Sequence, residues 1–288
     1  MALNELGGKV AAVTGAASGL GRAMALAFAS EGMHLALADV DEAGLTQTAT
    51  DVAAFGLKSF SMRVDVSKAE DVNRFAKRVT AELKRVHVVC NNAGVALSGP
   101  VWETSEAEWQ WILGVNLLGV VNGVRAFAPR LIAQDEGHIV NTASVAGLIS
   151  PPGMGAYCVS KHAVVTLSEA LHHDLRERGS RVGVSVLCPA YVPTGIAESD
   201  RNRPSGASIP GKSAERLAKE AALKKAVAAG KLSADDVARA VVAAVKGNRF
   251  YVLTHPAIKG AVRARMEDVL EERAPRDPLT LRAPIRSS

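Results

Sequence analysis

The chain has 288 residues, of which 48% are hydrophobic and 22% are charged, and its formal net charge at pH 7 is +5. This composition supports a sizeable core, and the length fits one α/β domain over residues 1–288. The positive excess is spread along the chain without a basic stripe, which argues against a nucleic-acid-binding protein. Three widely spaced cysteines in apolar segments form no disulfide pattern, so we expect a reducing compartment.

The N-terminal segment lacks the pattern of a signal peptide. No apolar run reaches the roughly eighteen residues that span a bilayer. We therefore expect a cytoplasmic protein without a membrane partner.

Short apolar runs alternate with longer helical patterns along the chain. Five runs predict buried parallel strands, and two weaker candidates follow the same pattern: 10–13, 35–38, 86–90, 138–141 and 182–187, then 58–64 and 250–253. Helices are expected to begin near Gly19, Asp41, Lys68, Glu106, Ala156 and Ser233. This alternation predicts a Rossmann-like, doubly wound parallel sheet with helices on both faces.

Two segments depart from the alternation. Residues 194–230 hold prolines and glycines followed by an alanine-rich helix, and they are too many for an ordinary connection. We interpret this segment as a lid over the substrate; the alternative is a disordered surface insertion. Residues 273–288 are rich in Pro and Arg and predict a flexible tail.

A glycine-rich loop follows the first strand, in the sequence Thr14 to Gly21. In a loop between a strand and a helix, Gly15 permits a tight turn, Gly19 lets the backbone approach a pyrophosphate, and Gly21 lets helix and strand pack closely. The loop residues expected to bind the cofactor are Gly15, Ser18, Gly19, Leu20 and Gly21. Such a glycine pattern is weak by itself, but here it follows a strand and precedes an acidic residue.

That acidic residue is Asp39, at the end of the second strand. A carboxylate in this position accepts hydrogen bonds from the ribose hydroxyls of NAD and repels the extra phosphate of NADP. No cation adjoins it in the sequence, which favours NAD. The alternative is an ordinary turn residue at a strand end.

Tyr157 and Lys161 lie four residues apart, on one face of a predicted helix. A tyrosine hydroxyl titrates near pH 10, and a neighbouring ammonium lowers this pKa and so favours proton transfer at neutral pH. Ser144 follows the strand at 138–141, where ligand sites of open α/β sheets lie. A Tyr-x-x-x-Lys pair alone is more often a solvated helix face.

Other candidate residues favour structural roles. His172 and His173 are adjacent and lack ligand spacing, so no metal site is predicted. Cys158 has no histidine partner and is interpreted as packing. The three tryptophans at positions 102, 109 and 111 are interpreted as core or subunit contacts.

These motifs together resemble the classical short-chain dehydrogenase/reductase family, from residue 7 to about 195. The resemblance implies that Asn116, Ser144, Tyr157 and Lys161 are catalytic, with Asn116 holding a water that links Lys161 to solvent; a helix-kink residue is the alternative for Asn116. It also implies cofactor contacts for Asp65, Val66, Asn92, Ala93, Gly94, Tyr157, Lys161, Pro189, Val192 and Thr194. Ala190 stands where the family has glycine, so the resemblance does not predict the backbone conformation of that turn.

The resemblance implies an NAD-dependent oxidoreductase that acts on a secondary alcohol or ketone. Ser144, Tyr157 and Tyr191 are expected to bind the substrate, and nearby apolar residues favour a hydrophobic one. An NADP-dependent ketone reductase and a non-catalytic dinucleotide-binding protein are the alternatives. Pairing of the long helices over 106–131 and 156–178 is expected to give a homotetramer or a homodimer.

Overall fold

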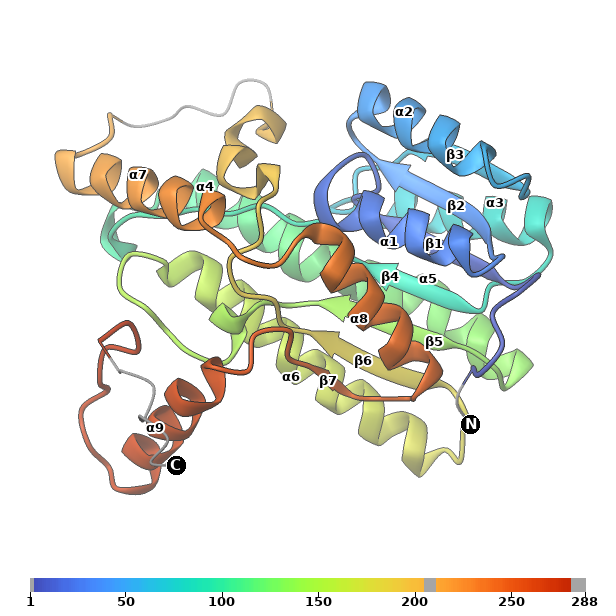
Figure 1. Cartoon of the computed structure of the whole chain (residues 1–288). Helices are drawn as coiled ribbons and strands as arrows, with labels where there is room; N and C mark the ends of the chain where they lie inside the picture. Colours follow the sequence, from blue (N-terminus) through green and yellow to red (C-terminus); the bar gives the residue numbers. More distant parts are fainter. Residues whose placement is uncertain (1–2, 205–210, 281–288) are drawn as a thin grey trace.

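The computed structural model describes residues 3–204 and 211–280 (Figure 1). Within these residues the strands form one seven-stranded parallel sheet in the order β3-β2-β1-β4-β5-β6-β7. The strands are β1 (Val10–Thr14), β2 (His34–Asp39), β3 (Ser59–Arg63), β4 (Val88–Asn91), β5 (His138–Thr142), β6 (Gly183–Leu187) and β7 (Tyr251–Val252). The order reverses between β1 and β4, and such a reversal opens a ligand crevice at the carboxyl ends of the strands.

Helices cover both faces of the sheet (Figure 1). One face carries α1 (Gly19–Ser30), α2 (Glu42–Ala53) and α8 (Ala234–Lys246). The other carries α3 (Ala69–Leu83), α5 (Gly119–Gln134) and α6 (Gly155–Glu177). The predicted Rossmann-like fold with a doubly wound parallel sheet is therefore confirmed, and all seven expected strands are present.

The first helix of the chain, α1, packs beside the late helix α8 on one face of the sheet (Figure 1). Met24 and Phe28 of α1 lie in the same buried cluster as Val241 and Val245 of α8. The apolar side of α1 is therefore covered by an element more than two hundred residues away in sequence.

The single helix expected from Glu106 is divided in the structure. It consists of α4 (Glu106–Leu113), a π-helical segment (Gly114–Leu118) and α5. The whole stretch to Gln134 is long and apolar enough to cross a membrane, and its most apolar 18-residue window has a mean hydropathy of 1.4. However, 56% of its most apolar window is buried against the rest of the domain, as expected of a core helix.

Near the C-terminus the structure contains a helix that the sequence did not predict, α9 (Ile258–Leu270). The tail expected from residue 273 onward stays a prediction; in the part of it that the structure describes, Arg273 and Arg276 both form ion pairs with Asp268 of α9. Asp268 is only 4% exposed, so these guanidinium groups fold residues 273–280 back along the helix. Residues 281–288 of the predicted tail lie outside the described residues.

His138 of β5 supports a prediction about stability and pH. Its side chain is 1% exposed, and burial lowers its pKa to about 3. Below about pH 6.5 the unfolded chain protonates this residue while the folded protein does not, so stability falls as the pH falls toward 3. We expect His138→Gln to reduce the slope of unfolding free energy against pH, between pH 5 and 6, by ~1.4 kcal/mol per pH unit.

Urea unfolding at several pH values measures this slope. Ser185→Ala is the matched control, because it removes the hydroxyl 2.7 Å from His138 Nε2 and keeps the imidazole. The control should lower stability at every pH and leave the slope unchanged. An unchanged slope in His138→Gln would show that another group takes up the proton.

Candidate active site

A cavity of about 920 Å³ opens at the carboxyl ends of the strands. One end lies between the glycine loop and Asp39, and the other lies beyond Ser144 and Tyr157. The parallel sheet gathers these residues because the loops that follow β1, β2, β4, β5 and β6 all emerge at the same edge.

The glycine loop has the backbone that a phosphate cradle requires. Gly15 and Gly19 have φ angles of +68° and +52°, in the left-handed region that favours glycine. A Cβ atom on Gly21 would stand 1.9 Å from the Gly15 carbonyl oxygen, so only glycine allows this approach of helix to loop. Ser18 and Leu20 also line the cavity.

Asp39 is held against this loop by its carboxylate. One oxygen accepts a hydrogen bond from the Ala17 N–H at 2.9 Å, and the other accepts one from the Val40 N–H at 2.7 Å. The structure also brings a cation to this place that the sequence did not reveal. Arg63 of β3 is the register partner of Asp39 and lines the same cavity.

The loop after β4 is fixed to the end of β1. The Thr14 hydroxyl accepts hydrogen bonds from the N–H groups of Asn92 and Ala93, at 3.0 and 3.2 Å. A Cβ atom on Gly94 would lie 3.4 Å from both Asn116 Oδ1 and Lys161 Nζ. The main chain at Gly94 therefore passes directly beside two of the predicted catalytic residues. Asp65 and Val66 line the cavity near Asp39.

Asn116 is fully buried in the π-helical segment, and its carboxamide joins three parts of the fold. Its Oδ1 accepts from the Val95 N–H at 2.8 Å, and its Nδ2 donates to the Val95 carbonyl at 2.9 Å and to Ser160 Oγ at 3.0 Å. The sequence left a catalytic role and a helix-kink role open for this residue. Its position in the π-helix fits the second role and is compatible with the first.

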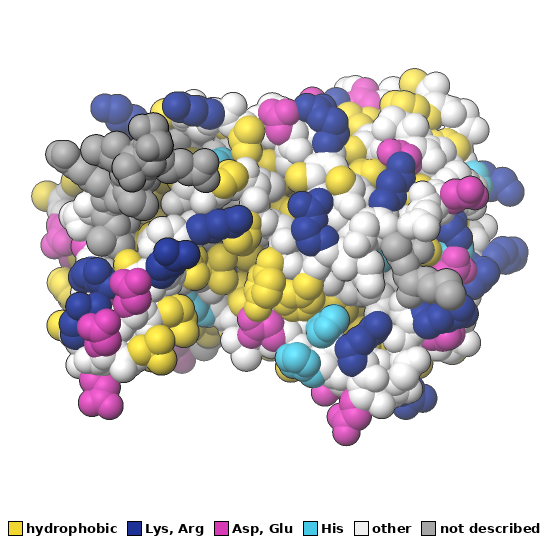
Figure 2. All heavy atoms as spheres, turned by 60° about the horizontal axis from the view of Figure 1, so that its bottom comes forward, with side chains coloured by type: hydrophobic (Ala, Val, Ile, Leu, Met, Phe, Trp, Pro, Cys, Tyr) yellow, Lys and Arg dark blue, Asp and Glu magenta, His cyan; other side chains and the backbone are white. Residues whose placement is uncertain are grey.

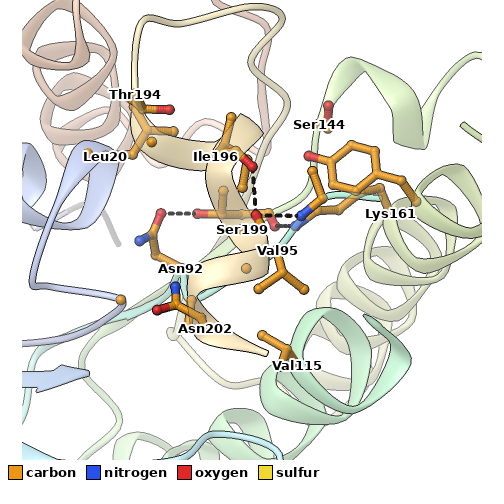
Figure 3. Close-up of a pocket in the computed structure, with 18 of the residues that line it drawn as sticks. Leu20, Asn92, Val95, Val115, Ser144, Lys161, Thr194, Ile196, Ser199 and Asn202 are labelled. Atoms are coloured by element: carbon orange, nitrogen blue, oxygen red, sulfur yellow. Dashed lines mark hydrogen bonds between the residues drawn. The ribbon is translucent and has the colours of Figure 1, made fainter. Parts of the chain in front are cut away.

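Ser144 and Lys161 lie close together in the cavity (Figure 3), and Tyr157 lines the same part of it. The Lys161 ammonium donates to the Thr142 carbonyl at 2.9 Å and lies 5.7 Å from the centre of the Tyr157 ring. Burial raises the pKa of the Tyr157 hydroxyl to about 12, against the effect of a hydrogen bond with Ser144. Burial lowers the pKa of Lys161 to about 8. In the protein alone, burial therefore sets the direction of the Tyr157 pKa shift, and the lowering expected from Lys161 is not seen.

The segment after β6 closes the site from the other side. The Pro189 carbonyl accepts from the Ser144 hydroxyl at 3.3 Å. Ala190 has no positive φ, and its N–H donates to His255 Nδ1 at 3.2 Å, so this turn accommodates alanine in place of glycine. Val192 is buried and Thr194 lies beside Gly19, while Tyr191 lines the outer part of the cavity and is 37% exposed.

Beyond Tyr157 the cavity wall is mainly apolar. Five side chains from three different segments form it: Trp111, Ile149, Met154, Leu223 and Val227. Leu223 and Val227 belong to α7 (Ala214–Ala228), the helix predicted within the segment 194–230. Residues 205–210 of that segment lie outside the described residues.

A buried group of charges attaches the lid segment to the rest of the protein, and no sequence pattern indicated it. Glu108 of α4 is fully buried and forms ion pairs with Arg216 of α7 and Arg203. Burial opposes ionisation, but hydrogen bonds from Arg216 and Ser105 outweigh it and lower the pKa of Glu108 to about 2. The Arg203 guanidinium also stacks 4.7 Å above the Trp111 ring. Only the Ser105–Glu108 capping box was recognisable as a sequence pattern, because Arg216 lies 108 residues away.

Comparison with known proteins agrees with this arrangement. The family model described as short chain dehydrogenase matches residues 9–205. A short-chain dehydrogenase/reductase of Burkholderia phymatum, solved in complex with NAD, is 50% identical, with a TM-score of 0.94 over 96% of this chain and 99% of that one.

Two curated relatives extend this comparison. The CLA biosynthesis dehydrogenase/reductase of Lactiplantibacillus plantarum is 33% identical over 93% of this chain and 95% of its own. The oxidoreductase EphD of Mycobacterium tuberculosis is 39% identical over 83% of this chain, which spans only 40% of that longer protein.

The chain belongs to the short-chain dehydrogenases, a family of oxidoreductases that use a nicotinamide dinucleotide.

The buried charges allow a prediction about the lid segment. Glu108→Gln would leave Arg216 and Arg203 buried without their carboxylate, and breaking a buried ion pair typically costs about 3–5 kcal/mol. We expect amide hydrogen exchange in α7 to accelerate at least tenfold, with exchange in the central strands changing much less. Mass spectrometry of peptides covering 214–228 measures this.

Glu82→Gln is the control, because it removes the carboxylate of an exposed pair with Arg78, which is worth at most about 1 kcal/mol. This variant should leave α7 unchanged. If the amides of α7 exchange in Glu108→Gln at the wild-type rate, other contacts hold the helix in place.

Proposed function

We propose that the protein is an NAD-dependent dehydrogenase that moves a hydride between nicotinamide and a hydrophobic secondary alcohol or ketone. The observation that carries this proposal is the single cavity, which joins Asp39 and the glycine loop at one end to Ser144, Tyr157 and Lys161 at the other. The glycine loop fits a pyrophosphate, because it lines the cavity and leads into the N-terminus of α1, where backbone N–H groups are free to bind an anion. A bound nicotinamide supplies the hydride chemistry.

The protein's own residues would manage the proton. The Tyr157 hydroxyl would exchange a proton with the substrate oxygen, and Ser144 would hold that oxygen by a hydrogen bond. Below about pH 8 Lys161 is protonated. Its positive charge near Tyr157 would stabilise the phenolate, whereas burial favours the neutral phenol. Asn116 would orient a water beside Lys161, since both flank Gly94.

The apolar outer wall supports a hydrophobic substrate. Trp111, Met154 and Leu223 offer no charge to a ligand in the region beyond Tyr157. Tyr191, at the rim, would contact the part of the substrate farthest from the reacting carbon. Segment 194–230 would act as the lid, because α7 provides one side of this wall.

The choice of NAD over NADP rests on Asp39, and Arg63 supports the alternative. A carboxylate near the ribose disfavours an added phosphate, whereas a guanidinium on the neighbouring strand would attract it. The relative solved with NAD is 50% identical, which adds support for NAD.

Self-association is also proposed. Figure 2 views the face that includes α6 and α9 and shows hydrophobic side chains gathered across its middle. On these elements and β7, Val159 is 50% exposed, Tyr251 45% and Val269 59%. Burial of this surface between copies would give a homodimer or a homotetramer in the cytoplasm, where the three free cysteines stay reduced.

Tyr157→Phe tests the catalytic proposal. The ring and its packing remain while the hydroxyl is lost, so we expect turnover to fall by about 10²–10⁴-fold. NAD affinity, measured by calorimetry, should change less than about threefold. If the variant retains a tenth of the wild-type activity, Tyr157 is not the acid and base. If the wild-type protein binds NAD but oxidises no alcohol in a broad screen, the protein is better explained as a non-catalytic binder.

Asp39→Ala tests the cofactor proposal. The wild-type protein should prefer NAD over NADP by at least about tenfold in kcat/KM, since opposing a phosphate with a carboxylate costs at least about 1.4 kcal/mol. The variant should lose this preference, and Arg63→Gln added to it should weaken NADP use alone. Equal use of both cofactors by the wild-type protein would contradict the role given to Asp39.

A further inference from the structure

A short helix of the lid crosses above the groove at the glycine loop. This segment, η4 (Gly195–Asn202), consists of two short 3₁₀ turns joined across a kink at Glu198. It begins beside the phosphate loop, where Thr194 Cβ lies 3.2 Å from the position of a Cβ atom on Gly19. Farther along, Ser199 Oγ accepts a hydrogen bond from the Ala96 N–H at 2.9 Å, in the loop after β4. Figure 3 shows η4 passing between these two attachments, with Ser199 and Ile196 directed toward the cavity.

Arg201 of η4 turns back toward the phosphate loop. Its guanidinium donates to the carbonyl oxygens of Gly195 at 2.6 Å and Glu198 at 2.9 Å. Its nitrogen Nη2 stands 2.9 Å from the position of a Cβ atom on Gly195, the residue that follows Thr194. Arg201 also lines the main cavity.

The charge of Arg201 is not neutralised, unlike that of its neighbours. Arg203, Lys212 and Arg216 all form ion pairs with carboxylates. Among the described residues, no carboxylate lies within ion-pair distance of Arg201, whose hydrogen bonds go to backbone carbonyls. A guanidinium has five N–H donors, so donors remain for an anion.

The phosphate loop itself lacks a free side-chain cation. Arg22, the first basic residue of α1, is paired with Asp51 at 2.6 Å. Asp39 and Asp65 line the same cavity, and so do Arg63, the register partner of Asp39, and Lys68, which is paired with Asp65. A pyrophosphate placed at the N-terminus of α1 would meet the backbone N–H groups of the loop, which itself carries no cation.

We propose that Arg201 binds the pyrophosphate of the dinucleotide from the lid side, so that η4 and the glycine loop enclose it between them. This role rests on the proposed binding of NAD in this groove. It makes the cofactor itself a link between lid and sheet, because one end of η4 would be held by the ligand's charge and the other by Ser199. The substrate wall that follows η4 would then be ordered by cofactor binding.

Binding of NAD, ADP-ribose and adenosine to Arg201→Gln tests the proposal by calorimetry. Charge-assisted hydrogen bonds are roughly twice as strong as neutral ones, and this site is partly open to solvent. We expect about a tenfold loss of affinity for NAD and ADP-ribose, which contain the pyrophosphate, and less than a twofold change for adenosine. The affinity of the variant for NAD should also depend less on salt than that of the wild type.

Two control variants separate charge from structure. Arg239→Gln removes an exposed positive charge on α8 and should leave NAD affinity unchanged. Ser199→Ala loosens η4 without changing its charge, so it should leave the salt dependence at the wild-type value. Arg201→Lys should recover part of the lost affinity.

The outcomes distinguish this inference from the proposed function. A wild-type protein that fails to bind NAD would overturn both. Tight wild-type binding with no loss in Arg201→Gln, an equal loss for adenosine, or an unchanged salt dependence would overturn the role of Arg201 and leave the dehydrogenase proposal intact.

Discussion

The active-site edge of this protein depends on the side-chain amide of Asn116. Its hydrogen bonds to both polar groups of Val95 fix the loop after β4, and its bond to Ser160 fixes the helix that carries Tyr157 and Lys161. The Ser160 hydroxyl in turn donates to the Tyr157 carbonyl at 2.8 Å. One wide π-helical turn is the local cost of placing this amide, and such turns are frequent at functional sites.

The two sides of the cavity are held in different ways. The sheet side uses close main-chain contacts at Gly15 and Gly21 that only glycine permits. The lid side uses ion pairs between long side chains, centred on Glu108. Because Glu108 is buried, separating its carboxylate from Arg216 and Arg203 would cost free energy. A fixed cofactor groove is therefore combined with a substrate wall whose position is set by electrostatics.

The strands, the glycine loop and the arrangement of Ser144, Tyr157 and Lys161 could be predicted because each follows from a local pattern. Alternating apolar runs identify β1 to β7, and parallel topology then brings the strand ends together. A helix kink at Asn116 was one of two roles that the sequence left open, but its partners Val95 and Ser160 could not be predicted, because they lie 21 and 44 residues away. Arg63 beside Asp39 and Arg216 beside Glu108 were missed for the same reason: each pair joins residues distant in sequence.

The packing of α1 against α8 has a consequence for synthesis of the chain. Translation proceeds from the N-terminus, so the apolar side of α1 leaves the ribosome long before residues 234–246 exist to cover it. Similarly, the central strand β1 is synthesised before β4, with which it pairs in the sheet. The nascent N-terminal half consequently displays Met24 and Phe28 to solvent for most of its elongation, which makes it a substrate for chaperones that recognise exposed hydrophobic helices.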